Sequence, residues 1–232
     1  MAAHKKKDTI EGHGFRNLLV FLLVYVVGSP FLAPYPSLAI LAHASLSVAL
    51  FVAVYAVQKR QKQRSFAMAL LLPLLILYWL GIYDIVPFSQ LGAYLLFAVY
   101  FGLLVYSYAI QIVHSRRVTP TVLYGSFCLY LITGLFWGSL YSVLQELSPG
   151  SYSGTLLDKV QGSSFHIFNY FSMVTLTSLG YGDITPQTPG AASLCQIEAI
   201  VGQFFTAVLV AWLVGMYMFE KQDERAKGVK ED

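Results

Sequence analysis

The chain has 232 residues, of which 56% are hydrophobic and 12% are charged, and its formal net charge is +3. Soluble domains carry about 25% charged residues, so these side chains are too few to solvate a globular protein of this length. Two cysteines and abundant bulky apolar residues exclude the disulfide-rich, collagenous and disordered classes. The small net charge gives no indication of a nucleic-acid partner. Composition therefore predicts an integral membrane protein.

Six apolar segments are long enough to be transmembrane helices, which need about 20 residues each. They are residues 17–33, 38–57, 66–83, 91–113, 122–144 and 192–219. Pro73 lies inside the third segment, where we expect it to kink the helix while neighbouring helices bond the freed carbonyl group. The sequence therefore predicts an all-α membrane protein with six transmembrane helices.

The basic residues predict how these helices are oriented. Of the 15 Lys and Arg residues, all but Lys159 fall on one side of an alternating six-helix path. Because cytoplasmic loops carry the excess of Lys and Arg, we expect segments 1–16 and 220–232, and so both termini, in the cytoplasm of a cell whose plasma membrane holds the protein. The N-terminal bases and the first apolar segment also resemble a signal peptide, whose removal would leave five helices and the same inner loops.

A short aromatic segment separates the fifth and sixth predicted helices. Residues 145–162 are polar and rich in turn-forming residues, and Ser163 and Ser164 then precede an apolar run that ends at Thr175. Serine favours a helix N-cap, and a helix over 163–175 would be roughly 20 Å long, too short to cross a bilayer. Such a segment must enter the membrane and return on the same side. A re-entrant backbone is stable at membrane depth only when it is buried in protein or lines a water-filled space. We therefore expect a re-entrant pore helix.

The nine residues at 175–183 read Thr-Leu-Thr-Ser-Leu-Gly-Tyr-Gly-Asp. Glycines at alternate positions, Gly180 and Gly182, permit backbone angles that other residues avoid, so that successive carbonyl groups can face the same way. A row of such carbonyls replaces the hydration shell of a cation, and the negative C-terminal end of the short helix favours a cation beside it. The segment therefore predicts a cation filter.

This nonapeptide resembles the signature of the potassium channel family, and the similarity covers residues 122–219, which we expect to form a pore domain. It implies a homotetramer in which four chains surround one pore, with K+ as the transported ion and no organic cofactor. It also implies that K+ is held at Ser178, Leu179, Gly180 and Tyr181. The implied filter comprises Thr177, Ser178, Leu179, Gly180, Tyr181, Gly182 and Asp183.

Three positions depart from the family's pattern. Ser178 replaces the usual threonine, keeping the hydroxyl but losing the methyl group that restrains it, so we expect a looser innermost ion site. Tyr170-Phe171 replaces the usual aromatic support of the filter, although Tyr170 can still hydrogen-bond Asp183. Val174 stands where some bacterial members carry glutamate, so no carboxyl pair with Asp183 is expected. We assign filter support to Tyr170, Phe171, Val174, Thr175 and Glu198.

The sixth predicted helix carries three residues of interest. Gly202 lies near its middle, where the family often has a bending glycine, so it is either a gating hinge or a site of close helix packing. Glu198 is the only formal charge within the predicted spans, and such residues are usually functional. We expect it to face the pore helix and bond a backbone amide or Thr177, the alternative being a protonated, structural carboxyl. Gln203 faces either the cavity or a neighbouring helix.

The first four helices lack the residues of a voltage sensor. Six helices with a pore loop before the last resemble the voltage-gated plan, whose fourth helix carries regularly spaced arginines, but residues 91–113 contain neither Lys nor Arg. We expect residues 17–115 to form a sensor-like domain without gating charges, followed by a linker at 116–121 whose Arg116 and Arg117 meet lipid headgroups. His43 is expected to be a core histidine. Four tyrosines are expected to make packing and interfacial contacts rather than to form a ligand site: Tyr94, Tyr100, Tyr106 and Tyr108.

The sequence thus predicts a potassium-selective channel that conducts K+ passively and is not an enzyme. Its expected partners are its own copies and membrane lipids, with no nucleic acid. Glu146, Asp158 and Asp183 would give four copies a negative outer vestibule, unless the two loop acids serve only for solvation. One alternative is a nonselective cation channel, which the intact Gly-Tyr-Gly disfavours. The others are a subunit of a potassium transporter, and an enzyme or receptor in which the motif occurs by chance.

Overall fold

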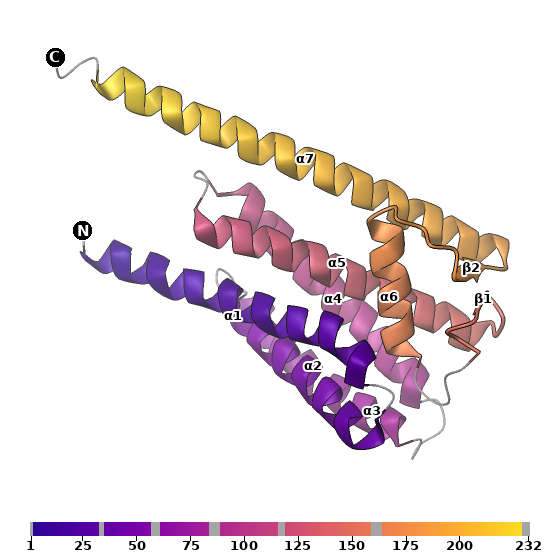
Figure 1. Cartoon of the computed structure of the whole chain (residues 1–232). Coiled ribbons are helices and arrows are strands. Elements are labelled where there is room, and N and C mark those ends of the chain that lie inside the picture. Colours follow the sequence, from indigo (N-terminus) through magenta and orange to yellow (C-terminus); the bar gives the residue numbers. More distant parts are fainter. Residues whose placement is uncertain are drawn as a thin grey trace.

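The computed structural model describes residues 2–32, 35–56, 61–83, 89–115, 119–158 and 164–228. Within these ranges the chain forms a bundle of long helices, a short helix that crosses between them, and a two-stranded antiparallel sheet (Figure 1). The elements in chain order are α1 (Ala2–Leu32), α2 (Pro36–Ala56), α3 (Gln61–Ile82), α4 (Ser89–Val113), α5 (Pro120–Leu147), β1 (Tyr152–Gly154), α6 (Phe165–Leu176), β2 (Ile184–Pro186) and α7 (Pro189–Gly228).

Each predicted span corresponds to one helix. α1 begins well before the expected span, and α7 continues beyond it to a length of 40 residues, about 60 Å. Five helices contain a stretch long and apolar enough to cross a membrane: Gly14–Leu32, Arg64–Ile82, Ser89–Val113, Pro120–Leu147 and Pro189–Met218. Among the described residues of α2, the apolar stretch Ile40–Tyr55 is shorter than the length needed for a candidate span. Six crossings therefore remain a prediction.

Local sequence explains where the helices begin and how they continue. Thr119 has extended backbone angles and its side chain accepts a hydrogen bond from the backbone N–H of Val122, while Pro120 occupies the first helical position, where its missing N–H costs nothing. α3 continues through Pro73. The first turn of α1 and the last turn of α7 lie at the same end of the bundle (Figure 1). Arg116, Arg117 and Lys159 lie outside the described residues.

Aromatic side chains join the first four helices into one core. Tyr94, Tyr100 and Tyr108 are buried on α4. The Tyr100 hydroxyl donates to the carbonyl of Leu50 (2.5 Å) and the Tyr108 hydroxyl to the carbonyl of Ala53 (2.7 Å), so α4 is tied to α2 by bonds from its tyrosines. These three tyrosines therefore make the expected packing contacts.

His43 and Tyr106 complete the predictions for this part of the chain. His43 is half-buried, and its Nδ1 lies 2.5 Å from the Tyr78 hydroxyl of α3, the arrangement of a hydrogen-bonded core histidine. Tyr106 is exposed on the outside of α4.

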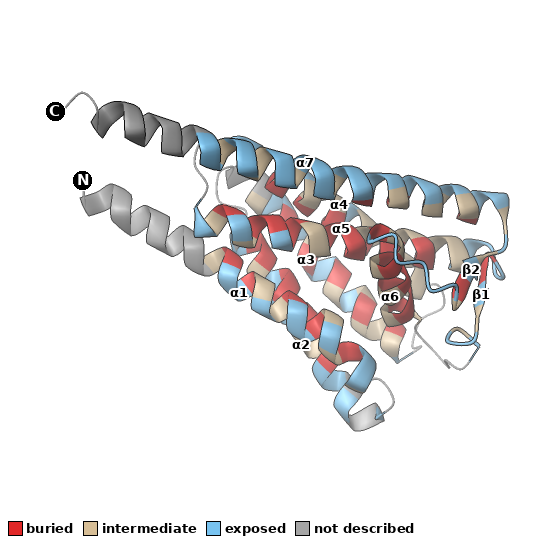
Figure 2. Cartoon of the chain, turned by 45° about the horizontal axis from the view of Figure 1, so that its top comes forward, coloured by how far each residue is buried: buried red, intermediate tan, exposed pale blue. Residues whose placement is uncertain are grey.

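Two glycines let α6 lie close to its neighbours. A Cβ atom at Gly138 of α5 would overlap the side-chain oxygen of Asn169 on α6, and a Cβ at Gly202 of α7 would overlap the backbone carbonyl of Leu176 at the end of α6. Small residues of this kind allow helices in membranes to approach closely. α6 is mostly buried as a result, whereas α7 exposes most of its surface in the single chain (Figure 2).

Replacing Gly202 with alanine should lower the stability of the purified protein. The added methyl group forces α7 away from the Leu176 carbonyl, and overpacking of this kind costs about 1–3 kcal/mol. The matched control is Gly215→Ala on the same helix, where a Cβ meets nothing within 4 Å and loss of a helical glycine is neutral or favourable. Melting temperatures in detergent compare the two variants. An unchanged melting temperature for Gly202→Ala would leave the hinge as the better interpretation of this glycine.

Candidate functional site

The candidate site is organised around α6, which is surrounded by other helices. Its 12 residues extend about 18 Å, too short to cross a bilayer. Phe168 and Ser172 are completely buried, and Asn169 donates a hydrogen bond to the Tyr25 hydroxyl of α1 (3.0 Å). Ser164 precedes the helix without making a side-chain capping bond, contrary to expectation, and Ser163 lies outside the described residues.

α6 ends in a turn that leads directly into the Gly-Tyr-Gly segment. The backbone N–H of Leu179 donates to the carbonyl of Val174 (3.0 Å), and that of Ser178 donates to the carbonyl of Thr175 (2.9 Å). These two bonds form a Schellman motif, whose left-handed position is usually glycine. Here Ser178 occupies it, with a φ of 58°. The left-handed region costs a non-glycine residue roughly 1–2 kcal/mol, so contacts elsewhere must hold Ser178 in place.

Positive φ angles recur at every second residue of this segment. They are 58° at Ser178, 59° at Gly180 and 76° at Gly182, while the intervening Leu179 and Tyr181 have negative φ. A strand turns its carbonyls to alternate sides, whereas this alternation of φ sign permits successive carbonyls to face one side. The side chains of Leu179 and Tyr181 are exposed in the single chain, 55% and 66% respectively.

The far end of the segment is tied back to α6 by Asp183. The Tyr170 hydroxyl donates to Asp183 Oδ2 (2.6 Å), which is the hydrogen bond expected from the sequence, and Asp183 Oδ1 accepts from the backbone N–H of Ile184 (3.1 Å). Desolvation and the neighbouring carboxylate raise the pKa of Tyr170 to about 12. The phenol therefore remains a hydrogen-bond donor at neutral pH.

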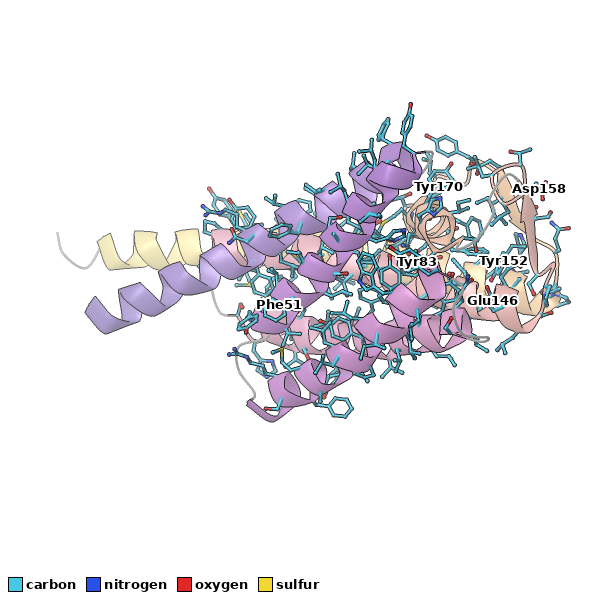
Figure 3. All side chains as sticks on the ribbon, turned by 90° about the horizontal axis from the view of Figure 1, so that it is seen from below. Phe51, Tyr83, Glu146, Tyr152, Asp158 and Tyr170 are labelled. Atoms are coloured by element: carbon cyan, nitrogen blue, oxygen red, sulfur yellow. The ribbon has the colours of Figure 1, made fainter. Side chains whose placement is uncertain are left out.

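A two-stranded sheet, which sequence analysis did not predict, continues this anchorage. β2 follows Asp183 and pairs with β1 from the loop after α5, with Ser153 opposite Thr185. Strands of three residues carry almost no periodic signal, and their pairing depends on residues about 30 positions apart. Tyr152 of β1 lies with Glu146 and Asp158 at this end of the molecule, as Figure 3 shows.

The other residues that were predicted to support the filter on α6, Phe171, Val174 and Thr175, lie in different environments. Phe171 is buried and lies against the rings of Tyr141 and Tyr152, with centroids 5.0 and 5.7 Å apart, so within its own chain it belongs to the core beside β1. Its support of the filter stays a prediction. Val174 is buried and supplies the carbonyl of the turn. The Thr175 hydroxyl donates to the carbonyl of Phe171 within α6 (2.8 Å).

Glu198 of α7 links its own helix to α5 and α6. It is fully buried, and its carboxyl group bonds the hydroxyl of Tyr141 on α5 and the hydroxyl of Ser172 on α6, the latter at 2.5 Å. It therefore faces α6 as expected, but its partner there is Ser172. The Thr177 hydroxyl instead donates to the carbonyl of Met173 (2.8 Å).

The proton count at Ser172 favours a protonated Glu198. The Ser172 oxygen also lies 2.7 Å from the carbonyl of Gly134, and a single hydroxyl proton cannot serve both acceptors. When Ser172 donates to Gly134, the proton between Ser172 and Glu198 must come from the carboxyl group. A neutral Glu198 then satisfies every contact in the cluster.

Gln203, adjacent to Gly202, makes a contact that sequence analysis left undecided. Its side-chain Nε2 donates to the Ser178 hydroxyl at 2.9 Å. Gln203 therefore faces Ser178, at the start of the Gly-Tyr-Gly segment of its own chain. A polar residue beside a glycine on a pore-domain helix is the only sequence signal that marks it.

Glu198→Gln should preserve the stability of the protein, whereas Glu198→Leu should lower it. Glutamine is neutral and can accept from Tyr141 while donating to Ser172. Leucine removes both bonds and leaves the buried Tyr141 hydroxyl without an acceptor, at about 1–3 kcal/mol, while Ser172 keeps its bond to Gly134. Thermal unfolding measures the difference, with the exposed Glu146→Gln as control. Equal damage by glutamine and leucine would mean that the carboxyl group is ionised.

Comparison with known proteins agrees with this geometry. Residues 125–219, from within α5 to within α7, match the family model described as ion channel. Two pore potassium channel a of Oryza sativa subsp. japonica is 30% identical over 95 residues, which cover 41% of this chain and 24% of that protein, so the match spans about a quarter of the relative's length. No solved structure matches the chain significantly. The protein is therefore an integral membrane protein whose residues 125–219 form an ion channel domain.

Proposed function

We propose that the protein is a potassium-selective channel that conducts K+ passively through a pore formed by four copies. The observation that carries this proposal is the alternation of positive φ at Ser178, Gly180 and Gly182, directly after a buried short helix. In the proposed pore, the carbonyls of Ser178, Leu179, Gly180 and Tyr181 and the Ser178 hydroxyl hold K+ in place of water. The filter runs from Thr177 to Asp183. The reaction is transport, so no catalytic residue is assigned.

The exposed surface of α7 supports assembly from several copies. Each chain supplies one filter segment, and a closed ring of carbonyls requires more than one. Large apolar side chains project from α7 without a partner in the single chain, and Ile200, Phe204 and Val208 are 56%, 67% and 62% exposed. A homotetramer covers these side chains with neighbouring subunits and membrane lipid.

The first four helices complete the proposed channel as a sensor-like domain over residues 17–115. α4 contains neither Lys nor Arg, so this domain does not move gating charges through the membrane field. With six crossings, both termini lie in the cytoplasm and the protein resides in the plasma membrane. The linker at 116–121 then joins this domain to the pore domain at 122–219, and Gly202 remains a proposed hinge.

Reconstituted protein should give currents that reverse near the potassium equilibrium potential. The measurement uses planar bilayers with mixtures of K+ and Na+ in opposite proportions on the two sides, because only a K+-selective pore moves the reversal potential to that value. A reversal potential near zero with robust current would indicate a nonselective cation channel. Accumulation of K+ against its gradient would indicate a transporter subunit.

Gly180→Ala should abolish K+-selective current. The added Cβ disfavours the positive φ of 59° and so disturbs the alternation on which the carbonyl row depends. Gly150→Ala is a matched control because Gly150 also has a positive φ, 85°, and open space around its Cβ position, but lies in the outer loop. Selective current that survives Gly180→Ala as well as it survives Gly150→Ala would contradict the assignment of the filter.

A further inference from the structure

Two adjacent residues of α7 contact the place where α6 becomes the filter. Gly202 allows α7 to approach the Leu176 carbonyl so closely that any Cβ would overlap it. This approach brings the side chain of the next residue, Gln203, to the Ser178 hydroxyl, to which its Nε2 donates at 2.9 Å. The close packing at Gly202 thus sets the distance across which Gln203 acts.

The Ser178 hydroxyl needs such a partner for a local reason. Serine lacks the second Cβ substituent that restricts χ1 in threonine, so its hydroxyl rotates more freely. Its backbone is also held in the left-handed region, with a φ of 58°. The side chain of Ser178 by itself therefore leaves the hydroxyl oxygen unfixed.

The hydrogen bond from Gln203 supplies the missing restraint without blocking the ion. A hydroxyl oxygen has two lone pairs and one proton, and a single N–H donor occupies only one lone pair. The second lone pair remains available to a cation. Gln203 is exposed in the single chain, as are residues 177–182 of the proposed filter, so this bond lies at the open surface of the proposed ion path.

We propose that Gln203 is a positioning residue that fixes the Ser178 hydroxyl at the inner end of the filter and thereby sets the preference of that site for K+ over Na+. This inference rests on the proposed potassium channel function and deepens it. Serine together with Gln203 performs the task that threonine performs through its methyl group. The contact also makes ion preference depend on the position of α7.

The test compares Gln203→Met, which keeps side-chain length but removes the donor, with the same change at Gln196, an exposed glutamine on α7. Permeability ratios come from reversal potentials, and isothermal titration of K+ and Na+ into the purified channel gives binding preference independently of gating. We expect Gln203→Met to lower the K+ over Na+ preference about two- to tenfold, the loss of one hydrogen bond, and Gln196→Met to leave it unchanged.

A double-mutant cycle with Ser178→Ala tests whether Gln203 acts on ion preference through the Ser178 hydroxyl. Once the hydroxyl is absent, Gln203→Met should cause no further loss, because the two residues act through one bond. A further loss in the Ser178→Ala background, an equal loss in Gln196→Met, or an unchanged preference in Gln203→Met would each overturn the inference alone. A wild-type protein without preference for K+ in either assay would overturn the proposed function as well.

Discussion

The structure depends on holding α6, a helix too short to cross a bilayer, inside a membrane protein. Backbone groups at membrane depth must be bonded within the protein, and the ends of such a helix cannot reach water on both sides. α1, α5 and α7 therefore enclose it, with Gly138 and Gly202 allowing close approach. Polar side chains fix its rotation, since Asn169 bonds Tyr25 and Ser172 bonds Glu198. The position of the proposed filter follows from this enclosure.

The proposed filter is a strained backbone segment held at both ends. At the inner end the turn after α6 places a serine in the left-handed region, and the side chain of Gln203 bonds that serine. At the outer end Tyr170 bonds Asp183, and the β1–β2 pair fixes the chain beyond it. A strained conformation persists only when its surroundings over-determine it. These supports thus hold the alternating backbone of residues 178–182 in place without a regular secondary structure.

The first four helices also contact α6 directly. Phe165, at the start of α6, stacks on Tyr94 and Phe97 of α4 with ring centroids 5.6 and 4.8 Å apart, and Asn169 bonds Tyr25 of α1. The tyrosine hydroxyls of α4 donate hydrogen bonds to carbonyls of α2. In a voltage sensor, this helix would instead carry mobile charges. These contacts connect the first four helices to α6, and so to the proposed filter, through aromatic and polar side chains rather than through basic residues.

The sequence by itself determined the helical spans, the short helix and the filter segment, because apolar length and alternate glycines are local properties that survive any arrangement of the chain. The resemblance to the potassium channel signature also allowed Tyr170 and Asp183 to be paired in advance. Tertiary structure decided the rest. The partner of Glu198 is Ser172 rather than Thr177, Phe171 belongs to the core beside β1, and β1 pairs with β2 across the whole of α6. Gln203 could be assigned only once the close approach at Gly202 had set its distance from Ser178. Such contacts depend on how helices far apart in sequence are rotated and spaced, which no local pattern encodes.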